Sequence, residues 1–226
     1  AEHPSRRASA ARLAARLLEL FCSVASAPDT AVALHRHDAA AKALGWMRIY
    51  SEDAAVQRTG CAFLQNFMSC KLRLWEAVHA AGGLQQLLPL LQRYLDQPDV
   101  LGDVILALSR LSTASSSIRH LRKHGVVNTI FKAVELHYDK QHIQRACLRL
   151  FWNVAAFTEL VKQILEHHGA GHAVKAMGHF HQSSDIVIPA AGMLRNMFAA
   201  GYTYGREAGS EFQQADGVQM LLESLW

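Results

Sequence analysis

Three asparagines in strongly apolar segments are the residues of this sequence whose type and spacing suggest specific chemistry. They are Asn66, Asn153 and Asn196, in the matching hexapeptides LQNFMS (64–69), LFWNVA (150–155) and LRNMFA (194–199). A primary amide both donates and accepts hydrogen bonds, and an amide buried without partners costs a few kcal/mol. We therefore expect each asparagine either to be paired or to face away from the core.

The other reactive residue types form no catalytic or metal-binding pattern. The four cysteines show no CxxC and no zinc-ligand spacing, so we expect reduced thiols packed in helices of a cytosolic or nuclear protein. No HExxH motif accompanies the thirteen histidines, which favours surface histidines near helix ends over a metal site. Five of them cluster near one predicted turn: His167, His168, His172, His179 and His181. Without a nucleophile elbow, P-loop or dinucleotide fingerprint, the sequence predicts a protein that is not an enzyme and needs no cofactor.

The asparagines recur with a fixed period. Asn66, Asn153 and Asn196 lie 87 and 43 residues apart, and 87 is close to twice 43. Arg110 occupies the missing register, 44 residues after Asn66. Ser23 lies 43 residues before Asn66, in the hexapeptide LFCSVA, which differs from LFWNVA at two positions.

A second marker keeps the same period. Gly82, Gly125 and Gly169 are spaced by 43 and 44 residues, and Asp38 holds the corresponding place in an earlier repeat. Two independent markers in one register indicate internal repeats.

Each repeat is predicted to contain three helices. Apolar residues recur at i, i+3, i+4 and i+7 along most of the chain, which indicates an all-α protein. The first helix ends at the glycine, which can take the positive φ of a C′ residue. A second helix follows, and then the turn residues Asp53, Pro98 or Asp185 can open the third helix, which carries the asparagine. On a helical wheel the positions two before, five before and one after the asparagine are apolar, so the asparagine should point away from the core.

Composition sets limits on the function. The 226 residues are 50% hydrophobic, enough for a sizeable core, and the formal charge of +4 is too mild to favour nucleic acid as the partner. No apolar run approaches the roughly 20 residues of a membrane span. The segment 5–26 is amphipathic and basic, and peripheral attachment to an anionic membrane is one interpretation of it. Its apolar face continues the repeat register, so we expect it to pack on the next repeat.

A 43-residue, three-helix repeat with a glycine between its first two helices resembles the armadillo repeat. The resemblance implies a right-handed α-solenoid, one domain over 1–226, in which neighbouring repeats stack into a continuous core. HEAT repeats are the nearest alternative, but they usually have two helices. The predicted boundaries are a partial repeat at 5–27, repeats at about 28–70, 71–114, 115–157 and 158–200, an insertion at 201–210 and a partial repeat at 211–226. The glycine-rich insertion is expected to be a loop.

The resemblance also implies a binding surface. In armadillo proteins the asparagine stripe lines a concave groove, where the amides hold the backbone of an extended peptide. Asn66, Asn153 and Asn196 match that role, while Arg110 and Ser23 depart from it. The alternative is that these amides bond a neighbouring helix and organise the solenoid. The basic side chains favour an acidic partner segment, although Asp103 also lies on the stripe; they are Arg110 and Arg149 on the stripe and Arg58 and Arg145 at its edge.

One branch of armadillo function is disfavoured by the residues themselves. Importin-alpha-type adaptors place a tryptophan four residues before the asparagine, and this sequence has Ala62, Leu106, Arg149 and Gly192 there. Trp152, one residue before its asparagine, is expected to pack between repeats. We therefore predict a cytoplasmic, or alternatively nuclear, scaffold that binds a segment of a protein partner. A regulatory or ligand-sensing domain of a larger protein is the alternative, because the last repeat breaks off at Trp226 before a third helix.

Overall fold

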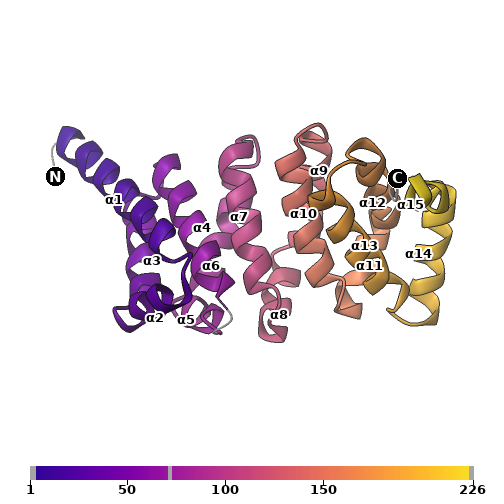
Figure 1. The fold of residues 1–226 in the computed structure, drawn as a ribbon, viewed down its shortest axis with the longest axis horizontal. Coiled ribbons are helices and arrows are strands. Elements are labelled where there is room, and N and C mark those ends of the chain that lie inside the picture. The colour runs from indigo at the N-terminus through magenta and orange to yellow at the C-terminus, as the bar shows by residue number, and fades with distance from the viewer. Residues whose placement is uncertain (1–3, 71–72, 224–226) are drawn as a thin grey trace. The chain divides into compact units, whose positions relative to one another are not determined.

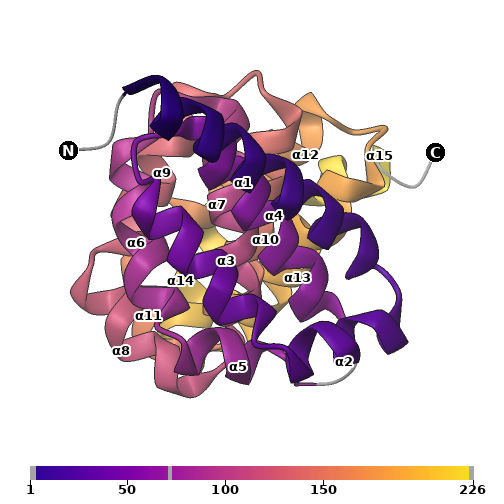
Figure 2. The same cartoon turned by 90° about the vertical axis from the view of Figure 1, so that its left-hand side faces the viewer.

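The structure, a computed structural model, describes residues 4–70 and 73–223. Within these residues the chain forms helices joined by short turns, without a β-strand (Figure 1, Figure 2). The helices fall into two compact units, Ala1–Leu111 and Ser112–Trp226, where the sequence predicts one domain.

The helices of both units follow the predicted repeats. Unit 1 contains α1 (Pro4–Val24), α2 (Pro28–Arg36), α3 (Ala39–Ile49), α4 (Ala54–Ser69), α5 (Trp75–Ala80), α6 (Gly83–Arg93) and α7 (Pro98–Leu111). Unit 2 contains α8 (Ser115–Lys123), α9 (Val126–Leu136), α10 (Gln141–Val154), α11 (Thr158–Glu166), α12 (Gly169–His179), α13 (Ser184–Phe198), α14 (Tyr202–Gln214) and α15 (Gly217–Glu223). Three helices lie in each of the four predicted repeats, and the second helix is 11 residues long in all four.

The third helices stack side by side within each unit. In unit 1, α4 lies between α1 and α7, and α1 holds the register of a preceding third helix (Figure 1). In unit 2, α13 lies beside α10. The predicted core face of these helices is confirmed, because the residues two before each asparagine position are buried: Leu64, Leu108, Phe151 and Leu194. Burial of a side chain of this size stabilises a fold by roughly 1.5–3 kcal/mol.

A left-handed residue separates the first helix from the second in every repeat. Its φ is +55° at Asp38, +81° at Gly82, +57° at Gly125, +54° at His168 and +56° at Asp216. The predictions for Asp38, Gly82 and Gly125 are confirmed, and the prediction for Gly169 is wrong by one residue. Gly169 is the first residue of α12, where a Cβ would lie 2.9 Å from the carbonyl oxygen of Ile164. A close backbone approach therefore requires that glycine, whereas His168 makes the turn.

The third helices begin as predicted. The side chain of Asp53 accepts a hydrogen bond from the Val56 N–H at 3.0 Å, which caps α4. Pro98 is the first residue of α7, and Asp185 lies in the first turn of α13.

Two buried glutamines add a contact that the sequence analysis missed. The Gln57 amide of α4 donates to the carbonyls of Met47 and Tyr50, at 2.7 and 3.0 Å, at the end of α3. Gln144 of α10 donates in the same way to Val134 and His137, at 2.9 and 3.1 Å, at the end of α9. The last carbonyls of a helix have no intrahelical partner, so the third helix closes the end of the second helix of its own repeat.

The segment 201–210 is not the predicted loop, because Gly201 precedes α14 and residues 202–210 lie within it. Gly205 lets α14 approach α13 closely, since a Cβ there would overlap the carbonyl oxygen of Phe198. Ala208 and Phe212, one turn apart, are buried and anchor the helix. The helix precedes the left-handed Asp216 and so takes the place of a first helix. The left-handed residues His168 and Asp216 are 48 residues apart, against 43 between Gly125 and His168, and the 13 residues of α14, against 9 in α11, account for most of the difference.

The N-terminal helix packs on the next repeat as predicted, through part of the predicted apolar face (the Phe21 ring lies 5.6 Å from that of Phe63) and through small side chains beside it. Ala11, Ala14, Ala15 and Leu18 of α1 are buried, and α1 lies against α4. Leu13 and Leu20, expected in the packing face, are 62% and 56% exposed. Small side chains thus form part of the contact, since they let two helices approach closely. Within the described ranges, none of the helices has the length and apolarity to cross a membrane.

Candidate functional site

The stripe asparagines make bonds between neighbouring third helices. Asn66 donates from Nδ2 to the carbonyl of Cys22 on α1 at 3.2 Å, and Asn196 donates to the carbonyl of Trp152 on α10 at 2.8 Å. Both side chains are half-buried, as is Asn153 on α10. The sequence left two roles open for these amides, binding a peptide backbone and bonding a neighbouring helix. The second role is observed for Asn66 and Asn196.

The stripe of unit 1 has mixed charge. Arg110 is exposed at the end of α7. Asp103, about two turns earlier on the same face, is half-buried, and its backbone and side-chain oxygens lie 3.4 Å from the Gln65 amide. Burial and the nearby charge of Asp103 raise the pKa of the Cys22 thiol. That thiol accordingly stays protonated and is a packing group rather than a nucleophile.

Arg58, the other basic candidate in unit 1, lies beside acidic groups. It is exposed on α4 and borders a hollow of about 570 Å³ that Asp96 and Asp99 also line. The hollow lies where the turn before α7 meets the start of α4. The structure thus separates Arg58 from Asn66 by about two helical turns.

In unit 2, Trp152 packs between repeats as predicted. A Cβ at Gly192 of α13 would overlap the Trp152 indole, so the glycine makes room for the ring. The indole remains partly exposed, and Arg149, one turn earlier on α10, is exposed. The α10–α13 surface therefore combines a flat aromatic group with a guanidinium group.

Three further side chains complete this surface of unit 2. Arg145, a predicted partner-binding residue, is half-buried and its guanidinium lies 3.5 Å from the Asp185 carboxylate on α13. Arg195 is exposed and donates to the side-chain amide oxygen Oδ1 of Asn196 at 3.4 Å, and Ile188 is 59% exposed. The sequence analysis missed Arg195 and Ile188, although Arg195 holds the same register as Trp152. We name Arg149, Trp152, Ile188, Arg195 and Asn196 the α10–α13 face.

The histidine cluster is distributed over separate contacts. His167 stacks on Phe131 with a ring separation of 4.7 Å, and its Nε2 lies 3.0 Å from the Asn128 amide oxygen. His168 Nδ1 lies 3.5 Å from the Glu211 carboxylate of α14. In the part of the chain that the structure describes, no group of three or more His, Cys, Asp or Glu residues is arranged to hold a metal ion.

Glu211 caps a helix of another repeat. Its carboxylate accepts a hydrogen bond of 3.1 Å from the Ala170 N–H, in the first turn of α12. Burial raises the pKa of Glu211 in spite of this bond and of the nearby His168.

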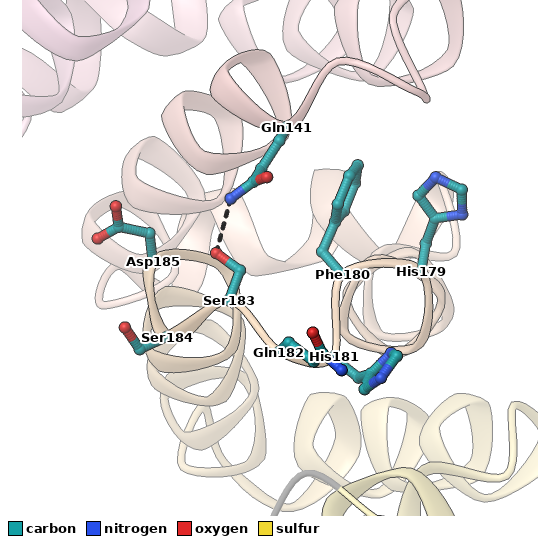
Figure 3. Close-up of a pocket in the computed structure, with 8 residues that line it drawn as sticks. All are labelled: Gln141, His179, Phe180, His181, Gln182, Ser183, Ser184 and Asp185. Atoms are coloured by element: carbon teal, nitrogen blue, oxygen red, sulfur yellow. Dashed lines mark hydrogen bonds between the residues drawn. The ribbon is translucent and has the colours of Figure 1, made fainter.

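A polar hollow of about 450 Å³ lies where α12 leads into α13 (Figure 3). The Gln141 amide of α10 donates across it to the Ser183 hydroxyl at 2.8 Å. His179 and Phe180 project to one side of the turn, and His181 points away from them (Figure 3). Gln141 and Ser183 are paired with each other, and most of the other polar residues of the hollow are exposed, as in an ordinary turn between two helices.

The four cysteines are free thiols. Cys61 and Cys147 are fully enclosed by apolar neighbours, and burial raises the pKa of both thiols well above the ordinary value. These two residues therefore act as small apolar side chains.

Comparison with known proteins agrees with this geometry. A family model described as "Protein zer-1 homolog-like, C-terminal domain" matches residues 18–222. A search of curated proteins finds no match.

Several solved structures with a similar fold are engineered proteins. A designed armadillo repeat protein, YIII(Dq)4CqI, superimposes with a TM-score of 0.72 at 17% identity, covering 94% of this chain and 93% of that one. A second designed armadillo repeat protein, in complex with the peptide (KR)4, gives a TM-score of 0.70 at 17% identity, covering 91% and 82%. Another engineered protein gives 0.74 at 22% identity, covering 93% and 82%. The fold is therefore that of an armadillo-type α-solenoid, as the repeats predicted.

Proposed function

This chain belongs to the family described as "Protein zer-1 homolog-like, C-terminal domain", and we propose that it is a non-enzymatic interaction module that binds a segment of a protein partner. Armadillo-like solenoids are typical of interaction scaffolds, because stacked repeats create extended binding surfaces. We propose the third helices as the binding surface. We also propose the cytoplasm or the nucleus as its compartment, in keeping with the four free thiols.

The α10–α13 face is the observation that supports this proposal best. Arg149 and Arg195 are exposed, and their guanidinium groups suit carboxylates, which they can bind through two parallel N–H···O bonds. Ile188 and the partly exposed Trp152 offer apolar contact beside them. The proposed ligand is therefore a segment in which acidic side chains alternate with an aliphatic one.

The asparagines are proposed to hold the backbone of that segment. The bond from Asn196 to the Trp152 carbonyl uses one N–H of the amide, and a primary amide has two. Asn66 also donates to the Cys22 thiol at 3.2 Å, so Asn66 and Asn153 are proposed by their register alone. An interhelix bond of this kind orients the amide in advance, which lowers the entropy lost on binding.

The remaining candidates are proposed with lesser weight. Arg110 is exposed in unit 1, where Asp103 offsets its charge. Arg58 borders two aspartates, and Arg145 is already close to Asp185. Of the predicted arginines, Arg149 is therefore the strongest candidate.

The charge of the α10–α13 face predicts the opposite preference from one of the similar designs. That designed protein is in complex with the peptide (KR)4, which is basic. Here the exposed charges of the face are arginines, so a basic peptide would be repelled and an acidic one attracted.

Fluorescence anisotropy with two labelled peptides tests the proposal. One peptide alternates Asp or Glu with Leu, and the other is (KR)4. We expect the chain to prefer the acidic peptide, and the double variant Arg149→Glu/Arg195→Glu to bind it at least about tenfold more weakly, which corresponds to about 1.4 kcal/mol. The melting temperature should be unchanged, because both side chains are exposed.

The matched control is Arg119→Glu, which reverses an exposed arginine on α8 in the same unit. This variant should bind the acidic peptide within about twofold of the unmodified chain. Equal losses in the control and in the double variant would indicate a general charge effect, and would remove the α10–α13 face from the proposed function.

A further inference from the structure

A second hollow of unit 2 lies between the second helices α9 and α12, and it shares His179 and Phe180 with the polar hollow. Its volume is about 380 Å³, within the range of ligand-binding sites. Val134 and Ala176 line it and are buried, and Phe180 adds an aromatic ring. Besides residues of α9 and α12 and of the turns that follow them, Gln144 of α10 lines this hollow, and no residue of the α10–α13 face does.

Unit 1 provides an internal comparison, because its helix α6 corresponds to α12. The Tyr94 N–H closes α6 by donating to the Leu90 carbonyl, and the Phe180 N–H closes α12 by donating to the Ala176 carbonyl. Ala176 therefore holds the register of Leu90, and Phe180 that of Tyr94. Leu90 and Tyr94 are both buried.

In unit 1, polar side chains from the end of α6 also reach across to the end of α3. Arg93 donates to the Ser51 carbonyl at 3.0 Å, and the Tyr94 hydroxyl lies 3.4 Å from the same oxygen. Arg93 also pairs with the Glu52 carboxylate at 2.9 Å. These contacts and the Leu90 side chain fill the space between α3 and α6.

Unit 2 replaces these side chains by smaller or aromatic ones. Ala176 is three carbon atoms smaller than leucine, His179 stands in the register of Arg93, and Tyr138 stands in the register of Ser51. The Tyr138 and His179 rings are 6.4 Å apart, and the His179 and Phe180 rings meet edge to face at 4.5 Å. His179 and Phe180 project to the same side of the chain (Figure 3). The hollow thus has a small apolar floor and ring-lined walls.

The polar groups of the hollow stand at its rim. Glu135 and Lys175 line it and are both exposed. His172, half-buried in the wall, has its pKa lowered, first by burial and then by the charge of Lys175. His172 is therefore a neutral ring at neutral pH. Aromatic rings pack favourably on one another at centroid distances of 4.5–7 Å, and a buried indole needs an acceptor for its N–H.

We propose that this hollow binds one tryptophan side chain of a partner polypeptide, with the indole between Tyr138 and Phe180 over Ala176 and its N–H donated to Glu135. The occupant has to be planar because ring walls face the space. Its N–H is assigned to Glu135 because that carboxylate stands at the rim, whereas Gln144, whose amide also lines the hollow, is buried and bonds the end of α9. The proposal goes beyond the proposed function: it adds a second contact surface, and either site can fail without the other.

Titration of the full chain with N-acetyl-tryptophanamide, followed by NMR of the Ala176 methyl group, tests this inference. A saturable shift is expected with a dissociation constant of roughly 0.1–1 mM, from the usual affinity per heavy atom. N-acetyl-leucinamide, which has no ring, should bind at least about fivefold more weakly. Equal binding of the two probes, or no saturable shift at Ala176, would overturn the proposal.

Two variants place the binding in the hollow. Ala176→Leu introduces the residue that unit 1 has at this register, and its larger side chain should reduce the affinity for N-acetyl-tryptophanamide at least about tenfold. Because this variant lacks the Ala176 methyl group, its titration is followed on the NMR signals of Phe180. Tyr138→Ser also restores the residue of unit 1, and because Tyr138 is 68% exposed the fold should tolerate it, with affinity reduced about fivefold. Leu136→Ala, an exposed change at the last residue of α9 and outside the hollow, is the control and should bind as the unmodified chain does. Unchanged affinity in Tyr138→Ser would overturn the proposal even if Ala176→Leu failed to fold.

Discussion

The side-chain amide of Asn196 donates a hydrogen bond of 2.8 Å to the backbone carbonyl of Trp152, which lies 44 residues earlier on the neighbouring third helix. Asn66 makes the same bond to Cys22, again 44 residues earlier, at 3.2 Å. Carbonyls in the last turn of a helix lack an intrahelical partner. Each amide therefore satisfies such a carbonyl and also sets the register between two stacked helices.

Replacement of Asn196 by alanine should destabilise unit 2 by about 1–2 kcal/mol, because it leaves the Trp152 carbonyl without this donor. Urea unfolding monitored by circular dichroism measures the change. Asn196→Asp keeps the shape but loses the N–H and should cost at least as much. Gln213→Ala, an exposed change on α14, is the control. A loss in Asn196→Ala no larger than that of the control would contradict a bridging role.

Gln144 should be more costly to replace than Asn196. Its buried amide donates to the carbonyls of Val134 and His137 at the end of α9, and the His137 carbonyl also accepts from the Lys140 N–H. Gln144→Ala removes two buried hydrogen bonds and should therefore cost about 2–4 kcal/mol in the same unfolding experiment. Gln144→Leu should cost less than Gln144→Glu, because a buried carboxylate facing two carbonyl oxygens is repelled. Leucine is also the natural residue at this register in the preceding repeat, where Leu101 is buried. Equal stability of the leucine and glutamate variants would refute this account of Gln144.

Most of the fold could be predicted from the sequence, because helix periodicity and helix capping depend on residues that are close together in the chain. The period of the apolar residues identified the third helices and their buried face, and capping chemistry identified Asp53 as the start of α4. The asparagine bonds could not be predicted in the same way, because their acceptors lie on a helix 44 residues away. Whether an amide faces a partner or a neighbouring helix depends on how closely two helices stack.

The wrong predictions also arise from tertiary contacts, which the local sequence pattern does not contain. Gly169 matched the glycine spacing, but a close approach to Ile164 requires it, and His168 takes the left-handed conformation. The glycines of 201–210 suggested a loop, yet burial of Ala208 and Phe212 overrides their low helix propensity. Arg195 and Ile188 of the α10–α13 face lie outside the asparagine register, so the stripe did not include them.

Gly192 and Gly171 should respond in opposite directions to alanine. A Cβ at Gly192 would overlap the Trp152 indole, so Gly192→Ala should displace the ring and destabilise unit 2 by about 1–3 kcal/mol. Gly171 lies in α12 with open space around it, so Gly171→Ala should stabilise by about 0.5–1 kcal/mol. Urea midpoints give both values, and tryptophan fluorescence should change in Gly192→Ala alone. Two stabilising substitutions would show that Trp152 does not pack on Gly192.

The cap that Glu211 provides should make unit 2 sensitive to pH in a defined direction. Burial raises the pKa of this carboxyl above its ordinary value of 4.5, so the folded state favours the protonated form. The contribution of Glu211 to stability is therefore complete below the ordinary pKa and is lost as pH rises through the raised pKa.

The variant Glu211→Gln tests this direction, because it keeps an oxygen that accepts from the Ala170 N–H but removes the charge. The stability of this variant relative to the unmodified chain should increase between pH 4 and pH 7, as measured by urea unfolding at each pH. Glu207→Gln, an exposed change on the same helix, should show no such trend. A relative stability of Glu211→Gln that falls as pH rises would mean that the ionised carboxylate, paired with His168, is the form that the fold favours.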